Sequence, residues 1–257
     1  MAPAGGNDSQ QEILYGLHAV REALKAENRP LQRLLVLRTD KQYTDVVQLA
    51  RSRRIPIHVQ PMASLDRVVP NGRHQGVVAF ASAKAYQTED SILVGAAHRQ
   101  EPPLLVILDG VEDPHNLGAV LRTAEGAGVH GVFIPERRAV GLTSAVAKAS
   151  AGAIDHIPVA RVTNMSRSIE SLKAAGVWIY GVTPSASKVF TDIDLRGPVG
   201  LVLGGEGMGI RPGVLQHCDD CIRIPLRGRV ASLNVSAAAA IVLFEAVRQR
   251  AEQNHRP

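Results

Sequence analysis

Short apolar runs alternate with stretches of helical spacing from Leu104 onward, and this alternation constrains the fold more than any other feature of the sequence. Strands that are apolar throughout are buried on both faces, and a helix between consecutive strands connects them as a crossover. The second part of the chain is therefore expected to be α/β, with a doubly wound, mostly parallel sheet. The expected strands are 104–109, 131–135, 156–160, 177–183, 200–205 and 221–226, and a long helix is expected from Ser232.

The first 85 residues predict a smaller α/β domain. Residues 11–26 carry apolar side chains at helical spacing and indicate an amphipathic helix, and a second helix is expected over 43–54. Strands are expected at 34–38, 55–59 and 76–82. The pattern indicates a small N-terminal domain over 10–84, a polar linker with one short helix over 85–102, and a second domain over 103–254.

Composition narrows the class of protein. The chain is 45% apolar, which is typical of a globular protein and exceeds what a disordered chain contains. The most apolar stretch, 235–244, is too short to span a bilayer, and the first 12 residues lack the apolar core of a signal peptide. Two cysteines cannot build a disulfide framework, so we expect a cytoplasmic protein without a membrane segment.

Cys218 and Cys221 form a single C-x-x-C pair. A zinc site would need a second pair or a histidine pair, and neither follows. A redox pair normally lies at a helix N-terminus, whereas this one leads into a strand. We therefore expect a structural role for both thiols and no bound metal.

The net charge of +5 lies entirely in the first third of the chain. Residues 1–85 hold 12 Lys/Arg against 7 Asp/Glu, and residues 86–257 hold 17 of each. Basic segments attract polyanions because each phosphate contact releases condensed counterions. A solvated helix face would also account for such a cluster. The candidate RNA-binding residues are Arg51, Arg53, Arg54, Arg73 and His74.

The first of three motifs is LDGVEDPHNLGAVLRTAEGAG at 108–128. Asp109 ends an expected strand, Asn116 is positioned to cap the helix that follows, and Arg122 lies on that helix. Loops at the carboxyl ends of parallel strands often carry functional sites. A capping loop with one surface arginine is the alternative explanation.

The second motif is LVLGGEGMGI at 201–210, in which four glycines surround Glu206. Glycines permit positive φ and a close approach of the backbone to a ligand, and a carboxylate among them needs a partner. The spacing is neither that of a dinucleotide-binding fingerprint nor that of a P-loop. A dehydrogenase or a nucleoside triphosphatase is therefore disfavoured.

The third motif is IPLRGRVASLNVSAAAAIVLFEAV at 224–247. A strand end leads into a loop with Arg227 and Arg229, and Ser232 is a plausible N-cap of the final helix. Asn234 would then lie just inside the helix, where its propensity is unfavourable. We therefore expect a functional role for the Asn234 side chain.

Together the three motifs, in their order and spacing over roughly 104–250, resemble the signature of the SpoU branch of the SPOUT RNA methyltransferases. YGLHAVREAL at 15–24 and GRHQGVVA at 72–79 resemble the RNA-binding domain of members that methylate a guanosine ribose in 23S ribosomal RNA. The resemblance implies a deep trefoil knot in the C-terminal domain, S-adenosylmethionine as cofactor, and a homodimer with the active site at the subunit interface. It also implies 2′-O-methylation of an RNA ribose.

The resemblance also assigns residues. Those implied to contact the cofactor are Gly204, Ile224 and Leu233, with Thr183, Gly205 and Met208 as secondary candidates. Those implied to be catalytic are Asn116, Arg122, Glu206, Ser232 and Asn234. The alternatives are a transfer RNA ribose methyltransferase of the same family and a non-catalytic RNA-binding protein that kept the fold.

Overall fold

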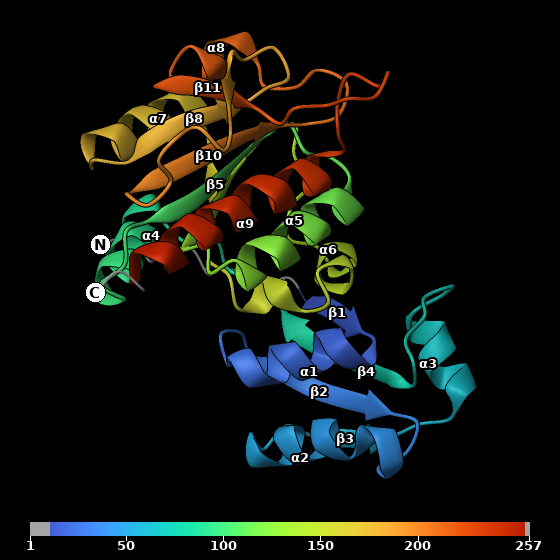
Figure 1. Ribbon diagram of the computed structural model, residues 1–257. Coiled ribbons are helices and arrows are strands. Elements are labelled where there is room, and N and C mark those ends of the chain that lie inside the picture. Colours follow the sequence, from blue (N-terminus) through green and yellow to red (C-terminus); the bar gives the residue numbers. More distant parts are fainter. Residues whose placement is uncertain (1–10, 255–257) are drawn as a thin grey trace, which may run out of the picture. The chain divides into compact units, whose positions relative to one another are not determined.

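A computed structural model describes residues 11–254, and the chain divides into two compact units, each with its own sheet (Figure 1). The N-terminal unit comprises the residues up to Ala85 together with Leu142–His156. The sheet unit comprises Tyr86–Gly141 and the residues from Ile157 onward. Each unit is described on its own.

The N-terminal unit contains a mixed sheet of four strands in the order β1-β4-β2-β3. β4 pairs antiparallel with β1 and β2, and β2 pairs parallel with β3. The strands are β1 (Gln11–Tyr15), β2 (Leu31–Val36), β3 (Ile57–Val59) and β4 (Val77–Ser82). The helices are α1 (Leu17–Ala26), η1 (Lys41–Tyr43), α2 (Thr44–Ser52), α3 (Met62–Val68), α6 (Ser144–Ala149) and η2 (Ala153–Asp155).

The expected helix over residues 11–26 is wrong in its first part, because residues 11–15 form strand β1. Gly16 has a φ of 95°, which ends the strand and lets helix α1 begin at Leu17. Within β1, Leu14 is 1% exposed, while Ile13 packs against the cluster that contains Leu65 on the other side of the sheet. Ile13 and Leu14 thus belong to a strand with apolar contacts on both faces. Two adjacent apolar residues also fit the spacing of an amphipathic helix, which is why the sequence pattern was misleading here.

A buried ion pair attaches residues 142–156 to the N-terminal unit. The Arg29 Nη2 donates to Asp155 Oδ2 at 2.9 Å, and the two side chains are each 1% exposed. The Arg29 Nη1 also donates to Glu12 Oε2 at 3.1 Å. Burial raises the pKa of Asp155, and the nearby Arg29 guanidinium opposes that rise. The N-terminal unit is therefore discontinuous in sequence, which the sequence analysis did not anticipate.

The sheet unit confirms the expected doubly wound parallel sheet. Its seven strands lie in the order β7-β6-β5-β10-β8-β11-β9, and every neighbouring pair is parallel. The strands are β5 (Leu104–Asp109), β6 (Gly131–Pro135), β7 (Val159–Val162), β8 (Trp178–Val182), β9 (Lys188–Val189), β10 (Val199–Gly204) and β11 (Asp220–Arg223). The short strand β9 was not expected.

Helices cover both faces of this sheet (Figure 1). The helices are α4 (Glu89–His98), α5 (Pro114–Gly126), α7 (Met165–Ala174), α8 (Pro212–Leu215) and α9 (Val235–Asn254). On one face, Ile92 of α4, Ile169 of α7 and Val214 of α8 share a core with Phe133 of β6. On the other face, α5 packs along α9. The segment expected to be a linker thus contains α4, whose Ile92 is only 2% exposed.

Neither cysteine has the character of a reactive thiol. Cys218 and Cys221 are both free. Burial raises the pKa of Cys218 to about 12 and also raises the pKa of Cys221, so both thiols stay protonated near neutral pH. Among residues 11–254, no group of three or more His, Cys, Asp or Glu side chains is arranged to hold a metal ion. No helix in this range is long and apolar enough to cross a membrane.

The end of α9 is held by one arginine. The guanidinium of Arg250 donates to four carbonyl oxygens in two segments, at distances of 2.7 to 3.1 Å. The acceptors are Pro102 and Pro103, just before β5, and Leu195 and Gly197, just before β10. The last helix is thereby tied to the segments that enter the two central strands.

We predict that Arg250→Met lowers the free energy of unfolding by about 2–3 kcal/mol, because four carbonyl oxygens lose a charged donor while the aliphatic packing remains. Urea unfolding followed by the fluorescence of Trp178, the single tryptophan and part of β8, measures this. Arg248→Met is the matched control, since Arg248 is on the same helix but pairs with Glu245 and Glu252 at the surface. Equal midpoints for the two variants would contradict the prediction.

Candidate functional site

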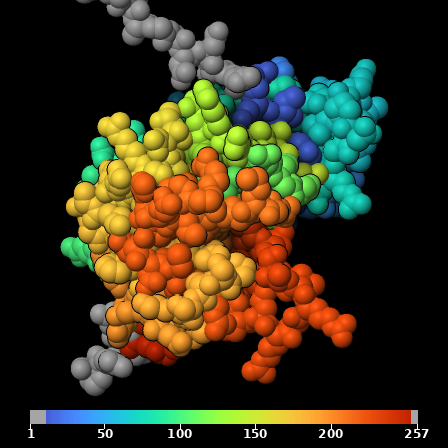
Figure 2. Space-filling model, turned by 90° about the horizontal axis from the view of Figure 1, so that it is seen from above, coloured from blue at the N-terminus to red at the C-terminus, as the bar shows by residue number. Residues whose placement is uncertain are grey.

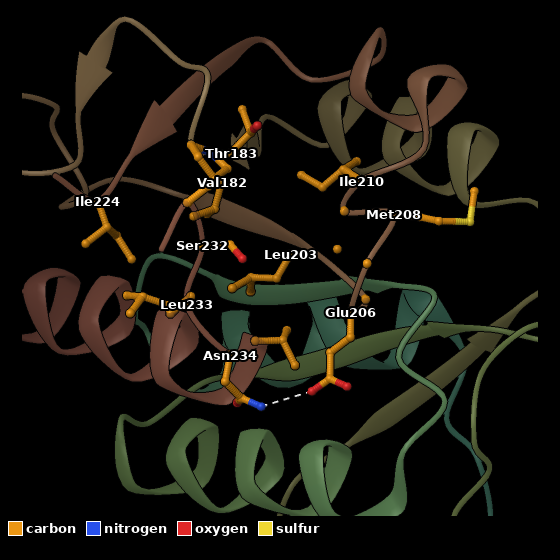
Figure 3. A pocket seen from close by; sticks show the side chains of 18 of the residues that line it. Val182, Thr183, Leu203, Glu206, Met208, Ile210, Ile224, Ser232, Leu233 and Asn234 are labelled. Carbon is orange, nitrogen blue, oxygen red and sulfur yellow. Dashed lines mark hydrogen bonds between the residues drawn. The ribbon is translucent and has the colours of Figure 1, made fainter. Parts of the chain in front are cut away.

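A pocket of about 570 Å³ lies at the carboxyl ends of β8, β10 and β11 (Figure 3). In parallel sheets, ligands bind in the crevice outside the carboxyl ends of the strands. The pocket is lined by residues 182–184 after β8, 203–210 around the end of β10, Leu215 of α8, Ile224 and Leu226 after β11, and 231–235 with Ala238 at the start of α9. Motifs two and three therefore meet in one cavity.

The glycine-rich loop 204–210 is folded closely on itself. A Cβ on Gly204 would lie 2.0 Å from the carbonyl carbon of Gly209, and one on Gly205 would lie 1.8 Å from the carbonyl oxygen of Gly110. Gly207 and Gly209 have φ values of 82° and 63°. The first two glycines are thus required by backbone packing within the protein, and the last two by their conformation.

Asp109 holds both ends of this loop. At the entry, its carbonyl oxygen accepts a hydrogen bond from Gly205 N at 2.8 Å. At the exit, its carboxylate accepts from Arg211 N at 2.8 Å and from Arg211 Nε, also at 2.8 Å. The Asp109 side chain is fully buried. The sequence analysis placed Asp109 at a strand end but did not find its partner 102 residues away.

Three polar side chains from the three motifs form one hydrogen-bonded network. Glu206 Oε1 accepts from Asn116 Nδ2 at 2.5 Å and from Asn234 Nδ2 at 3.0 Å, the latter drawn in Figure 3. The Asn234 amide also donates to Asn116 Oδ1 at 2.9 Å. The carboxylate expected to need a partner therefore has two amide donors.

Two helix caps differ from the sequence expectation. Helix α5 is capped by Asp113, whose carboxylate accepts from His115 N, and Asn116 lies buried in the first turn. Helix α9 begins at Val235, and Asn234 Oδ1 accepts from Ser236 N at 2.9 Å, so Asn234 rather than Ser232 occupies the N-cap position. The location of Asn234 is therefore favourable, and the argument from propensity was wrong.

Most of the residues singled out in the sequence come together at this pocket. Those that line it are Thr183, Gly204, Gly205, Glu206, Met208, Ile224, Ser232, Leu233 and Asn234. Asn116 reaches the site through Glu206. Arg122 is exposed on α5 and is not among the lining residues. The roles of all these residues stay predictions.

The pocket suits a ligand with an apolar ring and polar substituents. Apolar side chains form part of its wall, such as Leu203 near the end of β10, Ile210 in the loop that follows and Leu215 of α8, and the glycine loop contributes bare backbone. Its volume is in the range typical of cofactor sites. Sequence reasoning missed these residues, because an apolar residue looks the same in the sequence whether or not it borders a cavity.

In the N-terminal unit, the five candidate RNA-binding residues fall into two groups. Arg51, Arg54 and Arg73 are exposed. Arg53 donates to the carbonyl oxygens of the last turns of α1, at 2.8 and 3.2 Å. His74 is 4% exposed, with Nε2 3.0 Å from Asp66 Oδ1 and Nδ1 accepting from Gly76 N. Arg53 and His74 are therefore engaged within the fold.

Comparison with known proteins gives a consistent result. Residues 103–244 match the SpoU rRNA Methylase family, and residues 13–87 match the family described as RNA 2′-O ribose methyltransferase substrate binding. The chain is 44% identical over 242 residues to YacO of Bacillus subtilis, provisionally named a TrmH family tRNA/rRNA methyltransferase (94% of this chain, 97% of YacO). It is 42% identical to the 23S rRNA (guanosine-2′-O-)-methyltransferase RlmB of Pectobacterium atrosepticum (93% of this chain, 98% of RlmB).

A solved structure extends the likeness to the fold and the cofactor. The SpoU methyltransferase AviRb of Streptomyces viridochromogenes, solved in complex with S-adenosylmethionine, superposes with a TM-score of 0.80 at 26% identity, covering 96% of this chain and 94% of AviRb. The expected fold class, including the trefoil knot of the C-terminal domain, and the expected cofactor are confirmed. The chain belongs to the SpoU family of S-adenosylmethionine-dependent tRNA/rRNA methyltransferases.

Proposed function

We propose that this protein methylates the 2′-hydroxyl of a guanosine ribose in 23S ribosomal RNA, as a homodimer with the active site at the subunit interface. The observation that carries the proposal is the Asn116–Glu206–Asn234 network at the mouth of the cofactor pocket. The choice of RNA is supported by the substrate-binding match and by alignment with RlmB over almost the whole chain.

The residues at the ends of β10 and β11 and in the loop before α9 would hold the cofactor. Gly204, Ile224 and Leu233 provide backbone and apolar contacts, and Thr183, Gly205 and Met208 lie around them. Bound there, S-adenosylmethionine supplies a methyl group activated by its sulfonium. The chain's own task is to align the ribose hydroxyl with that methyl group and to ease the loss of the hydroxyl proton.

Arg122 stabilises charge rather than removing the proton. A guanidinium stays protonated throughout the physiological pH range and is a poor general base. In the described residues, the exposed Arg122 side chain has no hydrogen bond or ion pair, so it is available to grip a phosphate and stabilise the developing alkoxide. Glu206 acts through the amides it holds, and Ser232 lies exposed at the pocket with Asn234.

An apolar stripe on α9 supports the homodimer. Ala237, Ile241 and Phe244 are exposed at helical spacing, with Ile241 37% and Phe244 51% exposed. Exposed apolar surface of this kind favours burial against a partner. Because α5 packs along α9, a second copy covering this stripe would lie close to Arg122.

The decisive test is a map of 2′-O-methylated positions in ribosomal and transfer RNA from cells with and without the gene. We expect loss of one 2′-O-methylguanosine in 23S ribosomal RNA, restored by the purified protein with S-adenosylmethionine. A lost methyl group in transfer RNA instead would favour the alternative substrate. No lost methyl group in either RNA would contradict the proposal.

Gly204→Ala should weaken S-adenosylmethionine binding at least about tenfold, because the added methyl group meets backbone and forces the loop open. Gly213→Ala is the control, since a Cβ there meets no atom within 4 Å. Isothermal titration calorimetry measures both affinities, and urea unfolding confirms that both variants fold. Unchanged affinity in a folded Gly204→Ala protein would remove this loop from the cofactor site.

Arg122→Ala should lose nearly all methyl transfer, and Gly204→Ala should be nearly inactive at an S-adenosylmethionine concentration too low for its weakened site. Mixing the two under that condition should restore activity to roughly a quarter of the wild-type level if each site takes these residues from different subunits of a two-fold dimer. A mixed dimer then contains one intact site. Subunit exchange is verified by native mass spectrometry. If mixed dimers form and activity stays at background, Arg122 belongs to the same subunit's site.

A further inference from the structure

The loop between β11 and α9 is exposed from Pro225 to its end. All ten residues from Pro225 to Asn234 are exposed. Leu226 and residues 231–234 line the cofactor pocket, whereas Arg227, Gly228, Arg229 and Val230 do not. This segment projects from the molecule, orange-red in Figures 1 and 2. One part of the loop therefore forms a wall of the pocket, and residues 227–230, called the tip below, extend into solvent.

The tip carries two unpaired positive charges. Within residues 11–254, neither Arg227 nor Arg229 makes a hydrogen bond or an ion pair with its side chain. Three other arginines of the sheet unit are engaged within the fold: Arg211 with Asp109, Arg196 with Asp194, and Arg250 with four carbonyl oxygens. Folding of one chain thus leaves both tip guanidiniums free for a ligand.

The pocket itself is poorly suited to a polyanion. Among the described residues that line it, Glu206 alone carries an ionisable side chain. A ribose 2′-hydroxyl within an RNA strand, however, is flanked by phosphodiesters on both sides of the nucleotide. Any strand placed at this mouth brings negative charge toward Glu206, so cations on the rim are needed to offset the repulsion.

We propose that Arg227 and Arg229 bind backbone phosphates of the RNA strand next to the target ribose, an inference that rests on the proposed ribose 2′-hydroxyl acceptor. A guanidinium presents several donors in a planar fork that matches phosphate oxygens. Phosphate contacts fix the register of a strand and carry no base information. The two arginines therefore position the substrate, and the choice of nucleotide is made elsewhere.

The test compares full-length wild type with Arg227→Gln, Arg229→Gln and the double variant. The control is Arg99→Gln. Arg99 is an exposed arginine between α4 and the start of β5, so it lies toward the amino ends of the strands, away from the pocket at their carboxyl ends. The probe is a 23S ribosomal RNA transcript. Anisotropy gives RNA affinity at several salt concentrations, calorimetry gives S-adenosylmethionine affinity, and methyl transfer gives KM and kcat.

For the double variant we expect a KM for RNA raised about tenfold, with kcat at saturating RNA and S-adenosylmethionine affinity close to wild type. The slope of log affinity against log salt should fall by about 1.4–1.8, the value for two lost phosphate contacts. Each single variant should show about half of that change. Lysine at both positions should restore the slope, because the charge is retained.

A salt slope and KM equal to those of Arg99→Gln would overturn the proposal. So would a parallel loss of S-adenosylmethionine affinity, because the loop would then act by shaping the pocket. Failure of the proposed function is a separate result: wild type would bind the transcript without forming 2′-O-methylribose. Even then, the anisotropy slopes decide whether the two arginines contact phosphate.

Discussion

The functional site depends on the buried carboxylate of Asp109. Its burial requires compensation, which Arg211 provides through its backbone N–H and its guanidinium, both at 2.8 Å. Removing one partner of such a pair typically costs about 3–5 kcal/mol, because the other charge stays buried and unpaired. The carbonyl oxygen of the same residue accepts a hydrogen bond from Gly205 N at the loop entry. One aspartate therefore fixes both the point where the glycine loop leaves β10 and the point where the loop ends at Arg211.

With the loop held in this way, the three motifs become one site. Glu206 is carried by the loop, Asn116 by the first turn of α5, and Asn234 by the start of α9. The carboxyl ends of parallel strands lie along one edge of the sheet, so loops distant in sequence converge there. The shared oxygen of Glu206 fixes the orientation of both amides, and Asn234 also caps α9 through Ser236 N.

Local sequence patterns predicted most of the secondary structure, and the motifs with the family resemblance singled out nine of the residues that line the pocket. They failed in residues 11–15, where the apolar residues fit both a helix and a strand. They also failed at the start of α9, where both Ser232 and Asn234 are residue types that commonly cap a helix N-terminus. The glycines of motif two were singled out for a close approach to a ligand, and in the fold Gly204 and Gly205 are required by close contacts with other backbone atoms. The sequence shows where a glycine lies, but only the folded structure shows which neighbouring atoms leave no room for a Cβ there.

The sequence by itself determined most of the strands and helices, the parallel sheet and the family, because these depend on the period of apolar residues and on motifs short enough to read along the chain. Tertiary structure alone decided the strand order, the pairing of Asp109 with Arg211 and the assignment of residues 142–156 to the N-terminal unit. The last two of these features involve buried charges whose partners lie 102 and 126 residues away. Any of 29 Lys and Arg side chains is a chemically acceptable partner for an aspartate, and only packing selects one.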